Sequence, residues 1–342
     1  MNFQPRAFLD EIDKLLIDKW QRDFPLVHYP FTALGVPLGL SEDDVLLRLE
    51  RMIAEGTATR LGAVLAPNTL GASTLAAMAV PDERLDEVVE RVNSYPGVNH
   101  NYQREHDLNL WFVVTGADRD AVDATLAGIE EDTGLAVLDL PIECAYHIDL
   151  GFPIDGLKAS RAKDWKAQCS PDTSVITAQD RGLIRAIEDG LPLVDRPYAA
   201  IAKRLGTSED HVIARLQVLI GAGVVRRLGI VVRHHSVGFS SNAMAVWQID
   251  PVEVDELGSR FAQHPAVTLC YRRRPAAPQW PYNLFVMVHA KERAAAREVI
   301  ADLNRMHEVG DVPQAVLFST RCFKQRGARL GSAQAARKRS AR

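Results

Sequence analysis

The stretch PLVHYPFTALGVPLGLSEDDVLLRLERMIAEGTATRLGAV, residues 25–64, is written a second time as PLVDRPYAAIAKRLGTSEDHVIARLQVLIGAGVVRRLGIV, residues 192–231. The two stretches align without a gap and share the segments PLV, LG, SED and RLG. Further along the chain, Tyr102 and Arg104 correspond to Tyr271 and Arg273. Such a series of matches indicates an internal duplication, so the chain consists of two copies of one module.

The repeated stretch and the residues before it predict three short helices and a strand in each copy. Segments 9–20 and 178–188 carry apolar residues at helical spacing, and a shorter helix is expected after each. Ser41 and Ser208 are natural N-caps of a third helix, because a serine side chain accepts from unpaired backbone N–H groups. Alternating, strand-like residues follow, and this order is typical of a winged helix-turn-helix.

The remainder of each copy alternates strands and helices. In the first copy the order is ASTLAAMAV, DERLDEVVERVNS, VNHNYQRE, LNLWFVVTG, DRDAVDATLAGIEED and AVLDLPIECAYHI, which predicts the βαββαβ ferredoxin-like pattern. The second copy repeats this order from Asn242 to Cys322. We therefore predict an α+β fold, a tandem repeat of a winged helix-turn-helix plus a ferredoxin-like domain in the Lrp/AsnC-like arrangement. Such folds usually pair through their sheets, so the copies are expected to form an intramolecular pseudo-dimer.

The predicted boundaries follow from the repeat and from local composition. Segment 151–174 is turn-rich and polar, as in a linker, and the basic segment 326–342 lacks apolar periodicity, as in a solvated tail. The other predicted segments are winged helices at 8–66 and 175–233 and ferredoxin-like domains at 67–150 and 234–325.

Composition gives expectations about partners and location. The 40 Lys and Arg residues are outnumbered by 44 Asp and Glu residues, whereas a dedicated DNA binder usually has a basic balance. The four cysteines are far apart and form no Cys-x-x-Cys pair, so we expect reduced thiols and no zinc site or disulfide framework. No secretory signal is visible, and no stretch approaches the ~18 apolar residues that cross a membrane. The expected location is cytoplasmic.

The winged helices raise the question of DNA binding, and their third helices argue against it. A recognition helix reads the major groove with its N-terminal turn. Here those turns read SEDD from Ser41 and SEDH from Ser208, so acids would face the phosphates and base-pairing side chains are missing. We therefore expect no nucleic acid partner and a structural role for these domains.

The segment HNYQREH, residues 100–106, is the most informative for chemistry. Alternate residues of a strand share one face, so His100, Tyr102 and Arg104 are expected to line up, and His106 joins them if the strand persists. The core face of a strand is normally apolar, and a merely exposed strand favours Thr, Lys or Glu. We interpret the row as a site, with an exposed polar face as the alternative.

The matching strand of the second copy, LCYRRR from Leu269, retains part of this row. Tyr271 and Arg273 share a face, whereas Leu269 takes the place of His100. Arginine binds carboxylates bidentately and stays charged, and imidazole exchanges protons near neutral pH. The copies are therefore expected to have specialised, one for acid–base chemistry and one for anion binding, with Arg272 as a possible further contact.

Two further groups in the second copy are candidates for binding. The loop RHH, from Arg233, follows the second wing, and a neutral imidazole such as His234 is a common axial ligand of iron in a macrocycle. A plain surface loop is the alternative. On the next strand, Asn242, Met244 and Trp247 are candidates for the wall of a wide pocket, with a core position as the alternative.

The motifs HNYQREHDLNLWFVV, from His100, and RRLGIVVRHHSVGFSSNAMAVW, from Arg226, resemble those of the siroheme decarboxylases. The two-copy layout resembles the fused D–L form found in haem d1 biosynthesis, and the likeness covers nearly the whole chain. It implies a lyase, a carboxy-lyase, that removes carbon dioxide from the C12 and C18 acetates of siroheme to give 12,18-didecarboxysiroheme. It further implies that siroheme is the substrate, with no added cofactor and no metal bound by the protein itself.

The resemblance also implies roles for individual residues. His100 would be the main general acid, Arg104 and Arg273 would hold carboxylates, and the tyrosines would contact the macrocycle edge. His106 and His234 would be second candidates for proton transfer or for approach to the iron. Since Leu269 departs from the motif, one dominant pocket shared by both halves is expected. The expected site residues are His100, Tyr102, Arg104 and His106 for catalysis, and Arg233, His234, Asn242, Trp247, Tyr271, Arg272 and Arg273 for substrate binding.

Two other functions stay open at this point. A transcription regulator that senses a tetrapyrrole or an amino acid would bind duplex DNA in a salt-dependent way. A non-catalytic tetrapyrrole carrier would bind the pigment without changing its mass. The sequence also leaves open whether the partners include further related decarboxylase subunits or a second copy of the chain in a homodimer.

Overall fold

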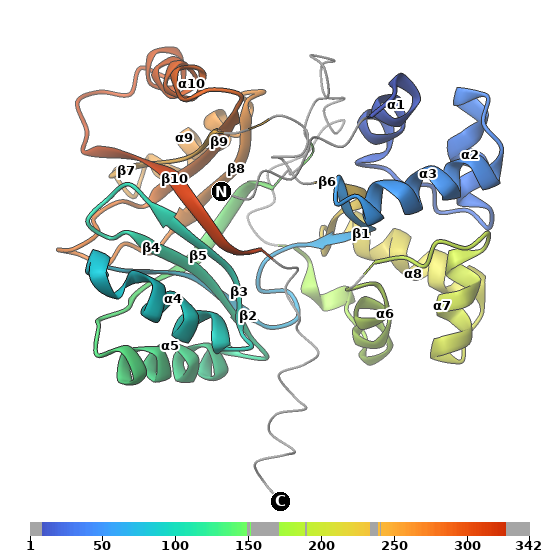
Figure 1. Ribbon diagram of the computed structural model, residues 1–342, viewed down its shortest axis with the longest axis horizontal. Coiled ribbons are helices and arrows are strands. Elements are labelled where there is room, and N and C mark those ends of the chain that lie inside the picture. The colour runs from blue at the N-terminus through green and yellow to red at the C-terminus, as the bar shows by residue number, and fades with distance from the viewer. Residues whose placement is uncertain are drawn as a thin grey trace, which may run out of the picture. The chain divides into compact units, whose positions relative to one another are not determined.

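The computed structural model describes residues 9–148, 151, 171–188, 190–232, 239 and 241–325. The chain forms two compact units, and each unit combines segments from both copies. We call them the winged-helix unit, which contains α1 to β1 and η3 to β6, and the barrel unit, which contains the remaining elements (Figure 1). Within the described ranges, no helix is long and apolar enough to cross a membrane.

The winged-helix unit has the helices that the sequence predicts. The Ser41 side chain accepts from the backbone N–H of Asp44, and Ser208 accepts from that of His211. Each wing contributes one strand, and the two strands, β1 and β6, pair with each other in antiparallel fashion. The elements of the unit are α1 (Glu11–Trp20), α2 (Pro30–Gly35), η1 (Val36–Leu38), α3 (Glu42–Ala54), β1 (Ala58–Leu65), η3 (Thr173–Val175), α6 (Ala178–Glu188), α7 (Pro197–Leu205), α8 (Glu209–Gly221) and β6 (Val225–Val232).

The second helix differs between the copies. Helix α7 runs to Leu205 and ends at Gly206, whose φ of 65° is left-handed. Helix α2 ends at Gly35 and continues as the short 3-10 helix η1, because Pro37 lacks the N–H that a longer α-helix needs. Gly39 then ends η1 with a φ of 66°, as expected for a C-cap glycine.

A buried ion pair ties the first helix to the third in both copies. Asp13 in α1 is fully buried, and its carboxylate lies 2.7 Å from Nη1 of Arg48 in α3. Asp180 in α6 is equally buried and lies 2.8 Å from Nη2 of Arg215 in α8. An unpaired buried carboxylate would be strongly destabilising, so these equivalent pairs fix the helix packing in both copies.

The barrel unit contains eight strands that close into a barrel in the order β10-β3-β4-β2-β5-β8-β9-β7. Each copy keeps the ferredoxin-like strand order, and the copies are joined where β5 pairs with β8 and β10 pairs with β3. The predicted pseudo-dimer is therefore confirmed, and closure leaves no sheet edge unpaired. The elements are β2 (Ala72–Met78), η2 (Asp82–Arg84), α4 (Leu85–Ser94), β3 (Val98–Arg104), β4 (Leu110–Gly116), α5 (Arg119–Thr133), β5 (Leu138–Ile148), β7 (Ser241–Trp247), α9 (Val254–Phe261), β8 (Val267–Arg273), β9 (Leu284–Ala290), α10 (Arg293–Met306) and β10 (Gln314–Gln325).

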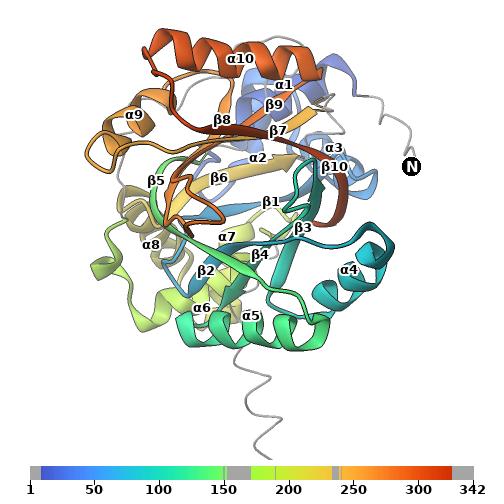
Figure 2. The same cartoon turned by 90° about the vertical axis from the view of Figure 1, so that its left-hand side faces the viewer.

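The helices α4, α5, α9 and α10 cover the outside of the barrel, as Figure 2 shows. Their apolar faces pack on the strands in two separate cores, one beneath α4 and α5 and one beneath α9 and α10, and the second core also contains Cys144 and Tyr146 of β5. A third apolar cluster, which includes Trp111, Leu140, Met244 and Phe285, takes residues from both copies. These residues alternate with the helix-facing ones, so they lie inside the barrel. The sheet face that carries no helices is therefore the inner face of the barrel.

One expectation from composition is wrong. Cys270 and Cys322 are free thiols, but Cys144 is disulfide-bonded, so the cysteines are not all reduced. Cys169 lies outside the described residues.

Candidate functional site

The structure brings three of the predicted catalytic residues into one column on the inner face of β3. The rings of His100 and Tyr102 stack with centroids 6.4 Å apart and an interplanar angle of 20°. The Arg104 guanidinium lies 5.8 Å from the centroid of the Tyr102 ring, within the range of a cation–π contact. The alternation that the sequence predicted for this strand is therefore present in the fold.

A bulge at the start of β3 orients His100. The register shifts between Val98 and His100, which leaves Asn99 as the extra residue. Asn99 Nδ2 donates to Thr115 Oγ1 at 3.2 Å, so its Oδ1 faces His100 Nδ1 at 2.7 Å. Because an amide oxygen only accepts, Nδ1 carries the hydrogen in neutral His100, and Nε2 is the nitrogen that gains or loses the second proton.

Arg104 is a buried cation held by neutral groups. Its Nη1 donates to the Leu317 carbonyl at 3.1 Å, and both Nη atoms lie 3.5 Å from Oδ1 of Asn242. Burial lowers the pKa of Arg104 to about 10. Among the described residues, its buried Nε has no hydrogen-bond partner. The site therefore holds a guanidinium with donor capacity to spare.

Arg273 repeats this arrangement in the second copy. It is 9% exposed, its Nη1 donates to the Leu140 carbonyl at 2.8 Å, and its guanidinium lies 5.2 Å from the Tyr271 ring centroid. Burial lowers the pKa of Arg273 to about 10, and its Nε also lacks a partner within the described part of the chain. Arg104 and Arg273 thus lie at equivalent positions of their strands, and each donates to a backbone carbonyl of the other copy.

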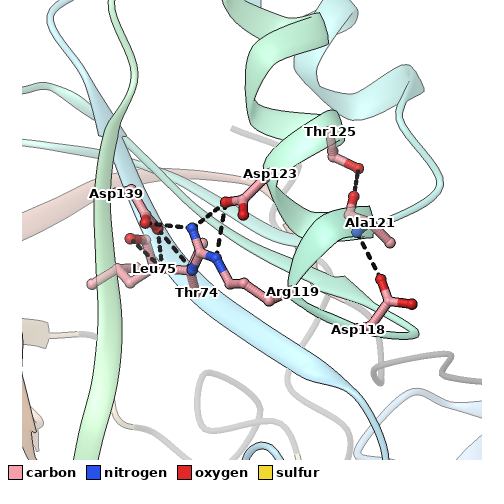
Figure 3. Close-up of polar contacts among 8 residues, drawn as sticks. All are labelled: Thr74, Leu75, Asp118, Arg119, Ala121, Asp123, Thr125 and Asp139. Atoms are coloured by element: carbon pink, nitrogen blue, oxygen red, sulfur yellow. Dashed lines mark hydrogen bonds and ion pairs between the residues drawn. The ribbon is translucent and has the colours of Figure 1, made fainter.

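Arg119, on the outside of the barrel, is a structural arginine and has the opposite environment. It bonds to Asp123 on its own helix and to Asp139 on β5, where Asp139 also accepts from Thr74 at 2.6 Å (Figure 3). Hydrogen bonding to Asp123, ahead of Asp139, raises the pKa of Arg119. The two inner-face guanidiniums have no such carboxylate partner among the described residues, which is the arrangement expected where an anionic ligand completes the charge balance.

His106 does not join the column, because β3 ends at Arg104. Its Nδ1 accepts from the Leu108 backbone N–H at 3.0 Å, and its ring packs edge-on against Trp280 at 5.4 Å. Burial lowers the pKa of His106, although the nearby Asp107 acts in the opposite direction. His106 therefore packs as a neutral ring against Trp280, which belongs to the third apolar cluster inside the barrel.

Two predicted binding residues, Arg272 and Trp247, lie on the outer face of the barrel, away from the column of β3. Arg272 precedes Arg273 in the strand and points the other way, where its Nη1 bonds to Asp255 of α9 at 2.7 Å and 2.8 Å. Trp247 is fully buried in the helix-facing core, packs on Phe261, and donates to Asn304. The physical reason is strand alternation, which places Trp247 opposite to Asn242.

The remaining predicted residues are placed unequally. Asn242 lies on the inner face and contacts Arg104, and Tyr271 lies beside Arg273. Arg233 and His234 lie outside the described residues. In the described part of the chain, no group of three or more His, Cys, Asp or Glu side chains could hold a metal ion.

Sequence reasoning missed two polar residues of the inner face. His289 on β9 and Thr268 on β8 are buried and hydrogen-bonded to each other, and His289 also contacts Asn242. The signal was a single histidine in the otherwise apolar strand LFVMVHA, residues 284–290. The strand pairing that sets Asn242 opposite His289 could not be predicted from either segment alone.

Comparison with known proteins gives matches over nearly the whole chain. The AsnC-like ligand binding domain family matches residues 69–147 and 236–324, and the siroheme decarboxylase NirDL-like HTH domain family matches residues 13–57 and 180–226. The siroheme decarboxylase NirDL subunit of Paracoccus denitrificans (strain Pd 1222) is 44% identical over 327 residues, covering 96% of this chain and 99% of that protein. The siroheme decarboxylase NirD subunit of Pseudomonas aeruginosa is 50% identical over 147 residues, covering 43% of this chain and 98% of that subunit.

A solved structure agrees with the sequence matches. The crystal structure of the siroheme decarboxylase NirDL in co-complex with an iron-uroporphyrin III analogue is 28% identical, with a TM-score of 0.68. The match covers 97% of this chain and 99% of that one. Together with the repeat and the barrel of two ferredoxin-like halves, these matches show that the chain belongs to the siroheme decarboxylase family, in its two-copy NirDL form.

Proposed function

We propose that this protein is a siroheme decarboxylase that removes carbon dioxide from the C12 and C18 acetates of siroheme, giving 12,18-didecarboxysiroheme for haem d1 synthesis. Family membership supports this activity, since the NirDL subunit is 44% identical over nearly the full length. The observation in the structure that carries it is the pair of buried guanidiniums of Arg104 and Arg273, neither of which forms an ion pair with a carboxylate among the described residues, with His100 in the same column as the first. An enzyme of this kind is a lyase, a carboxy-lyase.

The substrate carries several carboxylates, and these explain the arginines. A guanidinium that loses no charge to a protein carboxylate can bind a substrate carboxylate through two parallel hydrogen bonds. Arg104 and Arg273 would therefore hold carboxylates that are not lost, and so orient the macrocycle. Tyr102 and Tyr271, whose rings lie beside these guanidiniums, would pack on the macrocycle edge.

The reaction breaks the bond between the acetate methylene and its carboxylate. The electron pair of that bond passes to the pyrrole and its conjugated ring, carbon dioxide leaves, and a proton must then reach the methylene carbon to make a methyl group. Neutral His100 has its hydrogen on Nδ1, so a protonated His100 would deliver its second proton from Nε2. We propose His100 as the general acid and no cofactor besides the iron tetrapyrrole substrate itself.

His106 remains a second candidate for proton transfer. The lowered pKa of His106 leaves little of it protonated at neutral pH, and His106 also lies outside the column of β3. Its contact with Trp280 favours a role in the aromatic wall of the inner face. His234 remains a proposal for approach to the substrate iron, and Arg233 for substrate binding, without support from the described residues.

The test is anaerobic incubation of the purified chain with siroheme, followed by mass spectrometry of the extracted pigment. Loss of one or two carbon dioxide masses is expected, and two losses would mean that the chain needs no separate partner subunit. An unchanged pigment that co-elutes with the protein would indicate a carrier. No pigment binding together with salt-dependent duplex DNA binding would indicate a regulator and overturn the proposal.

Partner requirements follow from how the barrel closes. The NirD subunit matches less than half of this chain, so each copy corresponds in size to one separate subunit of the relatives. Here the strands of both copies complete one barrel. We propose that the fused chain supplies both subunits of the decarboxylase itself, whether or not it forms a homodimer.

A further inference from the structure

A row of hydrogen bonds runs from Arg104 into the second copy. Arg104 donates to Asn242 Oδ1 at 3.5 Å, and Asn242 Nδ2 lies 3.2 Å from His289 Nε2. His289 Nδ1 lies 2.8 Å from Thr268 Oγ1, and Thr268 donates to the Met287 carbonyl at 3.0 Å. Asn242, His289 and Thr268 are each no more than 9% exposed. We call these three residues the inner relay.

The groups at both ends of the inner relay require the same donor-to-acceptor direction of its hydrogen bonds. The Met287 carbonyl only accepts, so Thr268 donates to it and in turn accepts from Nδ1–H of His289. This tautomer makes Nε2 of His289 an acceptor for the Asn242 amide N–H, which leaves the Asn242 carbonyl oxygen facing Arg104. A guanidinium only donates, so the amide orientation also satisfies Arg104.

Among the described residues, the first copy has no counterpart of this relay at Arg273. Ser73 and Thr115 face each other across β2 and β4 as Asn242 and His289 do across β7 and β9. Within the described part of the chain, however, Ser73 bonds to Asn68. Thr115 accepts from Asn99, which belongs to the His100 contact. The two arginines are therefore held differently, although their strands are equivalent.

We infer that Asn242, His289 and Thr268 are positioning residues that fix the Arg104 guanidinium for carboxylate binding and make its end of the barrel the tighter carboxylate site. This inference rests on the proposed function, because it takes a siroheme carboxylate as the ligand. The Asn242 and Leu317 carbonyls hold the Nη atoms without cancelling the charge. The guanidinium is thus kept in one orientation, beside the His100 column, and its charge stays available for the substrate.

The first test determines the tautomer of His289 and does not depend on enzyme activity. Full-length protein labelled with ¹⁵N-histidine is studied by NMR in the absence of pigment, and the His289 signals are identified by their loss in His289→Gln. The Nδ1–H tautomer is expected in the wild type and in Thr268→Ser, which keeps the hydroxyl. In Thr268→Val the share of the Nε2–H tautomer is expected to rise. An Nε2–H tautomer in the wild type would overturn the inference.

The second test measures siroheme affinity by absorbance titration under anaerobic conditions. Thr268→Val is expected to bind siroheme about tenfold more weakly than Thr268→Ser, the loss of roughly one well-placed hydrogen bond. Ser73→Ala, at the position equivalent to Asn242, is expected to change the affinity by less than about twofold. Equal affinity of Thr268→Val and Thr268→Ser, or an equal loss in Ser73→Ala, would contradict the proposed asymmetry.

Failure of the proposed function would look different. If wild-type protein binds siroheme but leaves its mass unchanged, the decarboxylase proposal fails while the tautomer and affinity results still decide the relay. Asn242→Asp adds an independent check, because a carboxylate would pair with Arg104. A higher melting temperature with weaker siroheme binding is expected for this variant. Unchanged or tighter binding would contradict a role for the neutral amide.

Discussion

Strands β3 and β8 occupy equivalent places in the two copies, and they differ in the side chains that they carry on the inner face of the barrel. Both carry a tyrosine and then an arginine whose guanidinium bonds to a carbonyl of the other copy, on β10 or on β5. Only β3 carries an imidazole, His100, where β8 has Leu269. The two copies thus keep the tyrosine–arginine pair on both strands, and one of the two strands adds an imidazole.

Symmetry of the backbone therefore does not require symmetrical function. The bulge at the start of the strand occurs in both copies, at Asn99 and at Thr268. In the first copy the bulged side chain orients His100, and in the second it ends the inner relay. One backbone device serves two different positioning tasks.

The largest expected effect comes from removing the imidazole. We predict that His100→Ala lowers siroheme turnover by roughly 10²–10⁴-fold, the usual contribution of a general acid, while pigment binding is retained. Leu269→Ala, at the equivalent position, is the matched control and should leave turnover within a few-fold of wild type. Anaerobic single-turnover mass spectrometry measures both, and an active His100→Ala protein would remove His100 from the mechanism.

The next largest effect is expected from replacing the buried arginines, which should weaken siroheme binding but stabilise the unliganded fold. We predict that Arg104→Met weakens siroheme binding by about 10- to 100-fold, the loss of a charge-assisted hydrogen bond. The unliganded protein should become more stable by on the order of 1–3 kcal/mol, because a buried cation without a carboxylate partner is removed. Titration and thermal unfolding test this, and Arg273→Met probes the other side of the comparison. A loss of stability in both variants would indicate structural arginines.

A pH dependence follows from the same burial. Burial lowers the pKa of Arg104 in the folded chain to about 10, well below the ordinary range of an arginine. The charged form therefore costs stability at every pH below about 10, and this cost fades as the pH rises above 10. We predict that the stability advantage of Arg104→Met over wild type shrinks as the pH is raised from 8 towards 10.5 (about the folded pKa). Urea unfolding at several pH values measures it, and a constant advantage would contradict the lowered pKa.

The smallest effect is expected on the outer face. We predict that Arg272→Gln costs roughly 0–1 kcal/mol of stability, since its bonds to Asp255 are partly exposed to solvent. Siroheme affinity and turnover should change by less than about twofold. A large loss of affinity would mean that Arg272 reaches the substrate and would reverse its placement outside the site.

The sequence by itself determined the repeat, the helices, the strand order within each half and the column on β3. Periodicity and capping are local properties, so Ser41, Gly206 and the alternation of His100, Tyr102 and Arg104 could be predicted from neighbouring residues. The outer-face placement of Arg272 and Trp247 could not be predicted, because either face of a strand can carry a large side chain and only packing against helices or the barrel interior decides between them.

Tertiary structure alone decided which distant residues meet. Closure of the barrel brings the Leu317 and Leu140 carbonyls to Arg104 and Arg273, and the pairing of β7 with β9 sets Asn242 beside His289. These contacts depend on the register between strands far apart in the chain, which no local pattern encodes. The chemical groups could be identified from the sequence, but barrel closure determined which neutral partners hold each buried guanidinium among the described residues.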